Sequence, residues 1–270
     1  MRTNKKFWTM IAGAIIFSVM IFNLNLLASN GETSQEKDKR KEENKILLEI
    51  FKKFRVADVR DGMDWIGYHN FGSMDPSIRP LFRTKVVGIA RTVRYLPYEG
   101  PYPSAKGDEY TKWQGWYYGN VCTYPWMDEI EDGDFLAIDV SGVNVGLIGS
   151  ENSLRALLKG ARGFVFNGSG IRDTDEVINQ KIPVWTSFIA QSMVQCKIQF
   201  DAKNIPVAIG GVTVNPGDII VADGDGVIVV PRKVAMDVAK YADKILDEDK
   251  DTRKALYEKL KWELDDSVKK

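Results

Sequence analysis

The hydrophobic positions fall into short blocks whose spacing alternates between the helical and the strand period. Residues 46–54 carry apolar side chains at helical spacing, and residues 56–67 predict a second short helix that ends at Gly67. Apolar runs bounded by turn residues predict strands. Strands are expected at 86–95, 135–140, 163–166, 183–185, 204–214, 218–223 and 226–231, and further helices at 154–161, 174–180 and 234–262.

This order of elements predicts the fold class. Strands that alternate with helices, together with β hairpins near the end, are typical of a layered α/β domain. The domain is expected to cover residues 46–270 and to end in a long, charged C-terminal helix. Residues 97–126 are rich in Pro, Gly, Trp and Tyr, and they are expected to form a long loop.

Residues 1–29 have the pattern of a targeting segment. Two lysines precede the apolar run 7–22, which fades into small residues. The pattern predicts a cleaved signal peptide, and the alternative is an uncleaved helix that anchors the protein in the membrane. In both cases the folded part is expected outside the cytoplasm, in the periplasm or the extracellular space. Residues 30–45 are almost wholly polar and are expected to form a solvated tether.

Composition and charge exclude several classes of protein. The 270 residues are 44% hydrophobic, which suits one medium domain with a real core. Of 37 basic and 37 acidic residues, three basic ones lie in the first 31 positions, so the remainder has 34 against 37, and no nucleic-acid partner is expected. The single histidine, His69, excludes a zinc site built from several histidines. Cys122 and Cys196 could pair in an oxidising compartment or remain free thiols.

Two segments share the order apolar strand, glycine-rich turn, helix. One turn contains Gly149, Ser150, Glu151 and Asn152, and the other spans 167–173. The N-terminus of a helix presents free backbone N–H groups and a partial positive charge, so two such ends that face each other would hold a carboxylate or a phosphate.

The second turn adds two side chains with useful chemistry. Arg172 could grip a carboxylate with two hydrogen bonds, and Asp173 could bind Mg²⁺ through oxygen, with water and substrate as further ligands. The structural alternative is a capping box, because Glu176 follows Asp173 by three residues and acids are common in a first helical turn. Spacing alone favours the alternative slightly.

Three other groups of residues are weaker candidates. Asp58, Asp61 and Asp64 share one helical face, which could be a metal site but favours a solvated surface. Six aromatic residues could line a sugar-binding or aromatic surface, or fill a subunit interface: Trp113, Trp116, Tyr117, Tyr118, Tyr124 and Trp126. The glycine-rich stretches 210–211 and 223–226 lack the spacing of a nucleotide or calcium loop and predict tight β turns.

Taken together, these segments resemble a known family. The motifs that carry the resemblance are at 56–67, 78–81, 87–93, 163–173, 182–184 and 207–231, and they lie within residues 56–253. The chain is similar to the 4-hydroxy-4-methyl-2-oxoglutarate aldolases and to the RraA-like regulators of ribonuclease E activity. The resemblance implies a swivelling β/β/α domain, assembly as a homotrimer or a dimer of trimers, and active sites between subunits.

The resemblance also assigns roles to residues. It implies that Gly149 to Asn152 hold the substrate carboxylate through backbone amides, that Arg172 grips the substrate, and that Asp173 binds the metal with Glu176 as the following acid. A carboxylate from the neighbouring subunit matches Glu248 or Asp249. Two departures stand out: Ser150 replaces the acid usual after the glycine, so that Glu151 is one residue further on, and the second turn is one residue longer than the family pattern.

The expected activity is a lyase reaction that depends on a divalent metal, Mg²⁺ or Mn²⁺. The substrate would be a small 2-oxo acid, cleaved at a C–C bond by retro-aldol reaction or by decarboxylation of an acid like oxaloacetate. Glu151 would move the proton through water. Two alternatives are a non-catalytic binding or regulatory protein, as in the RraA-like relatives, and a carbohydrate-related binding protein outside the cytoplasm. Asp173 argues against the first, because the regulators lack this acid.

Overall fold

The computed structural model describes residues 32–269, and the predicted signal peptide or anchor lies outside them. Of these, residues 44–269 form one compact unit, and residues 32–43 belong to a separate one that is considered by itself. Within residues 32–269, no helix is both long and apolar enough to cross a membrane.

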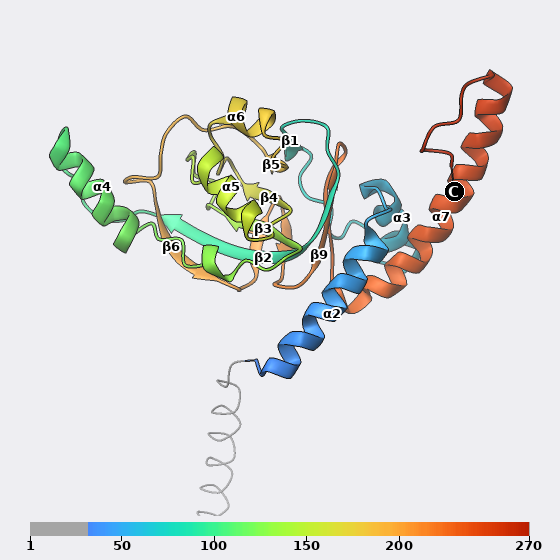
Figure 1. Cartoon of the computed structure of the whole chain (residues 1–270), viewed down its shortest axis with the longest axis horizontal. Coiled ribbons are helices and arrows are strands. Elements are labelled where there is room, and N and C mark those ends of the chain that lie inside the picture. Colours follow the sequence, from blue (N-terminus) through green and yellow to red (C-terminus); the bar gives the residue numbers. More distant parts are fainter. Residues whose placement is uncertain (1–31, 270) are drawn as a thin grey trace, which may run out of the picture. The chain divides into compact units, whose positions relative to one another are not determined.

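The elements follow the predicted alternation of helices and strands (Figure 1). The helices are α2 (Ser34–Phe51), α3 (Val56–Trp65), α4 (Asp108–Asn120), α5 (Ser150–Leu158), α6 (Thr174–Asn179) and α7 (Ala235–Leu260), with short 3₁₀ turns η1 (Met127–Glu129) and η2 (Arg232–Val234). The strands are β1 (Arg79–Pro80), β2 (Val86–Pro97), β3 (Asp134–Asp139), β4 (Gly163–Asn167), β5 (Val184–Thr186), β6 (Ile198–Lys203), β7 (Val207–Ile209), β8 (Val212–Val214), β9 (Ile219–Asp223) and β10 (Gly226–Val230).

Two expectations about these elements are wrong. The polar segment 30–45 is not a tether throughout, because α2 begins at Ser34. Its Glu and Lys residues are good helix formers, and pairs such as Lys39 with Glu43, four residues apart, support a helix without any apolar face. The segment 97–126 is not one long loop, because it contains α4.

The main sheet has eight strands in the described residues and nearly closes on itself. Its order is β1-β5-β4-β3-β2-β9-β10, and β6 pairs with β2. At one end of this order, β1 pairs with β5. The side chain of Arg79 in β1 also donates a hydrogen bond of 2.6 Å to the carbonyl of Asp225, next to β10 at the other end. Strands β2, β3, β4 and β5 run parallel, and β9 and β10 form an antiparallel hairpin. The predicted layered α/β fold with a long C-terminal helix is therefore confirmed.

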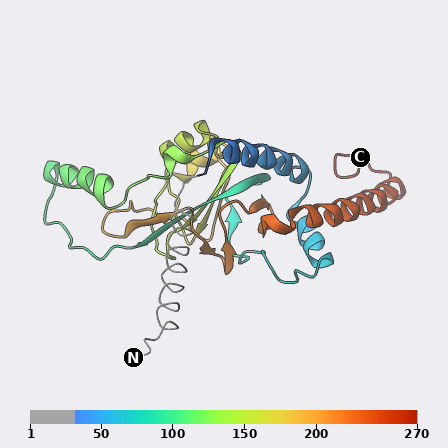
Figure 2. The same cartoon turned by 90° about the horizontal axis from the view of Figure 1, so that it is seen from below.

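Alternating side chains divide the interior into three cores. In β3, Phe135 and Ala137 point into the sheet's concave side, where the β7–β8 hairpin covers them. The intervening Leu136 and Ile138 point outward into a core shared with α4, α5 and α6. A third core lies where α3, α7 and the end of α2 pack on β9 and β10. In two perpendicular views, α4 and the far half of α7 extend away from opposite ends of the sheet (Figures 1 and 2).

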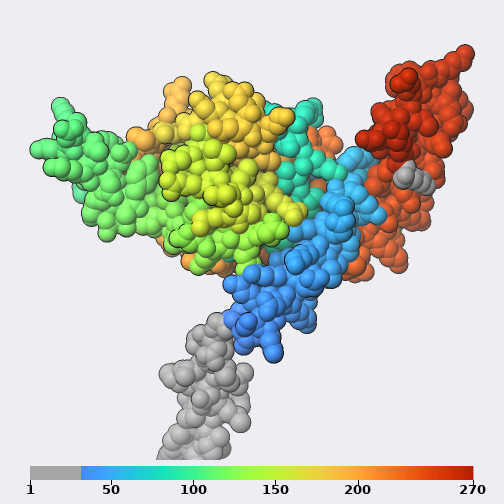
Figure 3. Space-filling view, in the orientation of Figure 1, coloured from blue at the N-terminus to red at the C-terminus, as the bar shows by residue number. Residues whose placement is uncertain are grey.

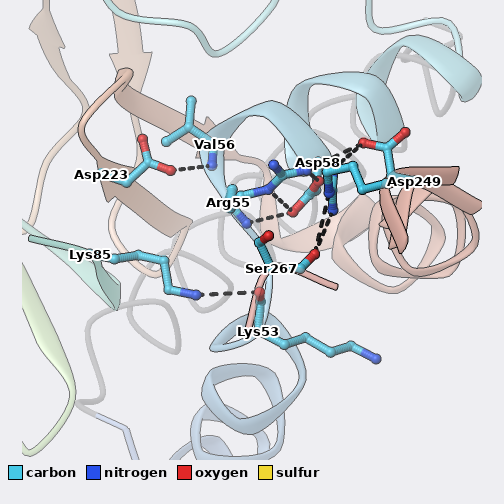
Figure 4. Close-up of polar contacts among 9 residues, drawn as sticks. Lys53, Arg55, Val56, Asp58, Lys85, Asp223, Asp249 and Ser267 are labelled. Carbon is cyan, nitrogen blue, oxygen red and sulfur yellow. Dashed lines mark hydrogen bonds and ion pairs between the residues drawn. The ribbon is translucent and has the colours of Figure 1, made fainter. Parts of the chain in front are cut away.

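The three aspartates of α3 form neither a metal site nor a uniformly solvated face. Asp58 is buried, and its carboxylate accepts hydrogen bonds from the Arg55 backbone N–H at 2.8 Å and from the Arg55 guanidinium at 2.5 Å (Figure 4). The same guanidinium reaches Asp249 of α7 at 3.5 Å. Asp58 thus caps its own helix and links it to α7. No group of three potential ligands from His, Cys, Asp or Glu surrounds a metal position in residues 32–269.

Replacing Asp61 by Asn is expected to stabilise the protein at neutral pH by about 0.5 kcal/mol, the scale of like-charge repulsion on a helix surface. Partial burial raises the pKa of Asp61, and the charges of Asp58, Asp64 and Asp249 add to the rise. The folded state therefore holds this proton more tightly than the unfolded state does. The wild type therefore loses stability as the pH rises from the unfolded pKa of about 3.9 through the raised folded pKa. Above that range, Asp61→Asn should have the larger free energy of unfolding.

Urea unfolding of both proteins at pH 3 and pH 7 measures this effect. The two free energies of unfolding should agree at pH 3 and differ at pH 7, and an equal difference at both pH values would contradict the electrostatic cause.

Candidate functional site

The two glycine-rich turns lie side by side. Ile148 and Ile171 form a parallel bridge between them. The Ile148 N–H donates to the Gly170 carbonyl at 2.9 Å, and the Arg172 N–H donates to the Ile148 carbonyl at 3.0 Å. These bonds hold the N-terminus of α5 against the start of α6, so the residues of both turns share one site.

Asp173 reaches across to the neighbouring helix. Its backbone adopts the left-handed conformation, with φ 56° and ψ 42°, and its side chain makes no capping hydrogen bond to α6. Instead, its carboxylate accepts a hydrogen bond from the Ser150 N–H, the first residue of α5, at 3.3 Å. The capping-box alternative for Asp173 and Glu176 is therefore wrong.

Two glycines make room for this arrangement. A Cβ atom at Gly149 would lie 2.2 Å from the Asp173 carboxylate oxygen, far inside van der Waals contact. A Cβ atom at Gly146 would lie 2.8–2.9 Å from the Arg172 side-chain carbons. Close approach of the acid and of the arginine stem to the segment 146–149 thus requires glycine at both positions.

Arg172 and Asp173 line the same small cavity of about 90 Å³. The Arg172 side chain is only 33% exposed, and its Nε atom lies 3.4 Å from the Asp173 carboxylate. Glu151 and Asn152 from the first turn of α5 also line it. The cavity therefore combines a guanidinium, a carboxylate and the amide end of a helix, which suits a small anion together with a cation.

The remaining predicted site residues differ in position. Glu151 lines the cavity, but its carboxylate is 77% exposed and pairs with Arg155 of the same helix at 2.6 Å. Glu176 is exposed and is not among the residues that line the cavity. Asp249 is bound within its own chain by Arg253 at 2.9 Å, whereas Glu248 lies 3.8 Å from Lys244 and is 67% exposed.

The donor atoms at the cavity fit a hard divalent cation. Asp173 supplies carboxylate oxygens, and Mg²⁺ commonly binds one or two carboxylates while water and substrate fill its other positions. Neither a histidine nor a cysteine lines this cavity, which disfavours zinc. Asp173 is therefore the residue that would hold such an ion, whereas the Glu151 carboxylate pairs with Arg155.

Sequence reasoning missed the contribution of the aromatic segment to this site. Tyr118, near the end of α4, lines the cavity, and the Tyr124 hydroxyl donates to the Leu147 carbonyl at 2.9 Å, just before Gly149. Burial raises the pKa of Tyr118, the nearby Cys122 thiol adds to the rise, and Gln195 and Arg172 oppose it. The phenol therefore remains neutral and can donate or accept a hydrogen bond at physiological pH.

The aromatic residues are mainly internal to this chain, contrary to both earlier interpretations. Tyr117 and Trp126 are fully buried, and Trp113, Tyr118 and Tyr124 pack against the same core. Trp116, at 50% exposure, is the large aromatic residue of this cluster that faces solvent. Cys122 and Cys196 are free thiols, the former buried among these rings.

The fold and the cavity define an α/β protein with a small polar cavity lined by a guanidinium and a carboxylate. The family model described as RraA-like, Aldolase/RraA, matches residues 56–229, and the chain belongs to this family. The sequence alone had identified the same family.

Two sequence relatives illustrate the range of this family. One, from Halalkalibacterium halodurans, is named "Putative 4-hydroxy-4-methyl-2-oxoglutarate aldolase"; it is 30% identical over 74% of this chain and 82% of its own length. Protein DlpA of Legionella pneumophila is 29% identical over 69% of this chain, but the chain spans only 28% of DlpA's length.

Solved structures agree with the fold. RraAS2 of Streptomyces coelicolor, described as an unusual member of the RNase ES inhibitor RraA family, matches with a TM-score of 0.61 and 25% identity, over 77% of this chain and 96% of its own. A structure described as one of the novel cellulases from gut-associated microbes matches with a TM-score of 0.63 and 27% identity, over 77% and 87% of the two chains.

Proposed function

We propose that this protein is a lyase that depends on a divalent metal and cleaves a C–C bond of a small 2-oxo acid. One observation carries the proposal: Arg172, Asp173 and the N-terminus of α5 meet in one cavity. A relative named as an aldolase supports the reaction class. The proposed reactions are retro-aldol cleavage of a 4-hydroxy-2-oxo acid and decarboxylation of oxaloacetate.

In this proposal, some residues of the chain bind the substrate and the metal, and one residue transfers a proton. The backbone amides from Gly149 to Asn152 and the Arg172 guanidinium hold the substrate carboxylate, because both present N–H donors and positive charge. Asp173 would hold Mg²⁺ or Mn²⁺, and a metal ion bound there would supply Lewis acidity for the 2-keto oxygen. Glu151, whose carboxylate is exposed and pairs with Arg155, would pass a proton through water.

Assembly and location complete the proposal. We infer a homotrimer or a dimer of trimers, in which Glu248 or Asp249 of one chain approaches the site of the next. The intrachain bonds of Asp249 favour Glu248 for that role. We also propose that the protein acts outside the cytoplasm, with residues 1–29 as its signal peptide or anchor.

Measurement of pyruvate release by the full chain tests the proposal. Oxaloacetate and several 4-hydroxy-2-oxo acids are supplied with Mg²⁺ or Mn²⁺, and enzyme-free samples with the same metal correct for spontaneous decarboxylation. Release is expected with metal, should fall at least about 100-fold in EDTA, and should return when Mg²⁺ is restored in excess. Activity unaffected by EDTA would contradict the metal requirement, and no release from any substrate would favour the non-catalytic regulatory alternative.

The carbohydrate alternative has weaker support. It depended on an exposed aromatic surface, but most of those rings belong to the core of this chain. The cellulase description of one structural neighbour applies to that protein.

A further inference from the structure

Tyr118 enters the cavity from a segment that lies outside the two glycine-rich turns. The segment connects β2 to β3, and Figure 3 shows α4 as an arm of the molecule (green) beside the surface formed by α5 and α6. Near the C-terminal end of α4, Tyr118 lines the cavity together with Arg172 and Asp173. No other aromatic side chain lines this cavity in the described part of the chain.

The position of Tyr118 is fixed by its buried neighbours. The adjacent Tyr117 is fully buried, and its hydroxyl donates to the Ile198 carbonyl at 2.6 Å. Its ring contacts those of Tyr98 and Trp113, with centroids 5.3 and 5.1 Å apart. Because Tyr117 anchors this end of α4, the backbone of Tyr118 is held beside the cavity.

The segment opposite α4 is also tied to the site. The Ser192 carbonyl accepts a hydrogen bond from the Gly146 N–H at 2.9 Å, and Lys197 donates to the Asn144 carbonyl at 2.8 Å. The side-chain amide nitrogen of Gln195, which lies between Ser192 and Lys197 in the sequence, is buried without a hydrogen-bond partner among the described residues. The half-buried Tyr118 therefore lies between α4 and a segment that is hydrogen-bonded to the residues before Gly149.

The volume of the cavity limits what can bind there. The cavity is small, at about 90 Å³, so a 2-oxo carboxylate head bound between Arg172 and α5 would lie close to the Tyr118 wall. Arg172 and the α5 amides account for the carboxylate of that head. A substituent on C3 must then share the remaining space with the Tyr118 ring.

We propose that Tyr118 sets the substrate preference of this site by limiting the size of the fragment that leaves from C3 of the 2-oxo acid. This inference rests on the proposed lyase function. The favoured substrate is oxaloacetate, whose leaving fragment is CO₂. When the C3–C4 bond of oxaloacetate breaks, the electron pair stays on C3, which takes a proton from water, and the products are pyruvate and CO₂. Larger 4-hydroxy-2-oxo acids lose a bulkier fragment and are disfavoured.

A size series at position 118 tests the inference. The ratio of kcat/KM for oxaloacetate to kcat/KM for 4-hydroxy-4-methyl-2-oxoglutarate is measured for the wild type, Tyr118→Phe, Tyr118→Leu and Tyr118→Ala. We expect the wild type to favour oxaloacetate and Tyr118→Phe to change the ratio less than about threefold. Tyr118→Ala should shift the ratio at least about tenfold toward the larger substrate, with Tyr118→Leu in between. Tyr102→Phe, in the same segment but 79% exposed, is the control and should leave the ratio unchanged.

Calorimetric binding of oxalate with Mg²⁺ provides a readout besides activity. Oxalate mimics only the head of the substrate, so its affinity should stay within about threefold in the Phe and Leu variants even if Ala weakens the fold. An active wild type with the same ratio across the series would overturn the role of Tyr118 alone. A wild type that neither releases pyruvate nor binds oxalate would overturn the proposed function, and this inference with it.

Discussion

Replacing Asp173 by Asn is expected to lower kcat/KM for the lyase reaction at least about 1000-fold, while the free energy of unfolding changes by less than about 1 kcal/mol. The amide keeps the shape of the side chain but removes the negative charge that would hold the metal. The loss of stability should be small, because the Asp173 side chain is 37% exposed and its bond to the Ser150 N–H is long, at 3.3 Å.

Asp175→Asn is the matched control, since Asp175 is an exposed acid in the first turn of α6 that does not line the cavity. It should retain the wild-type kcat/KM. Steady-state kinetics with Mg²⁺ and urea unfolding of both variants make the comparison. Nearly full activity of Asp173→Asn would remove the proposed metal site, and equal losses in both variants would point to a general effect of charge on α6.

Gly149→Ala is expected to weaken oxalate binding and kcat/KM by about 100-fold each, because the new methyl group must displace the carboxylate that lies 2.2 Å from its position. The methyl carbon would also lie 3.7 Å from the Arg172 Nε atom, so movement of the Asp173 carboxylate is expected to disturb the guanidinium as well. One added methyl group therefore acts on both charged groups of the cavity.

Gly115→Ala serves as the control for this prediction. A Cβ atom at Gly115, in the interior of α4, meets nothing within 4 Å, and alanine favours a helix by up to about 1 kcal/mol over glycine. Oxalate titration by calorimetry and thermal unfolding compare the two variants. If Gly149→Ala bound oxalate as tightly as the wild type, the close contact at Gly149 would not matter for the site.

Several parts of the fold were predictable because their causes are local. The glycine pair 210–211 forms the turn between β7 and β8, where both residues have positive φ, as a tight hairpin turn requires. The long helix expected at 234–262 is α7, Ala235–Leu260. The helix α5 begins at Ser150, four residues before the apolar spacing indicated, because its first turn is polar and carries no periodic signal.

Other elements were not predictable for reasons that are equally physical. In residues 108–120, aromatic residues fall on several sides, so the helical period is weak and the glycines argue against a helix. The anchoring of Tyr117 on the Ile198 carbonyl joins residues 81 positions apart, and no local pattern reports it. The strand β6 was missed because its side chains are mostly half-buried at the edge of β2.

The sequence by itself determined the family, the layered α/β class and the two glycine-rich turns that carry Arg172 and Asp173, because backbone preference and apolar period act over a few residues. Only the tertiary structure decided that the Asp173 carboxylate reaches the Ser150 N–H instead of capping its own helix, and that Tyr118 enters the same cavity. Both facts depend on contacts between segments distant in sequence, whose energies arise only when the sheet has brought the turns together.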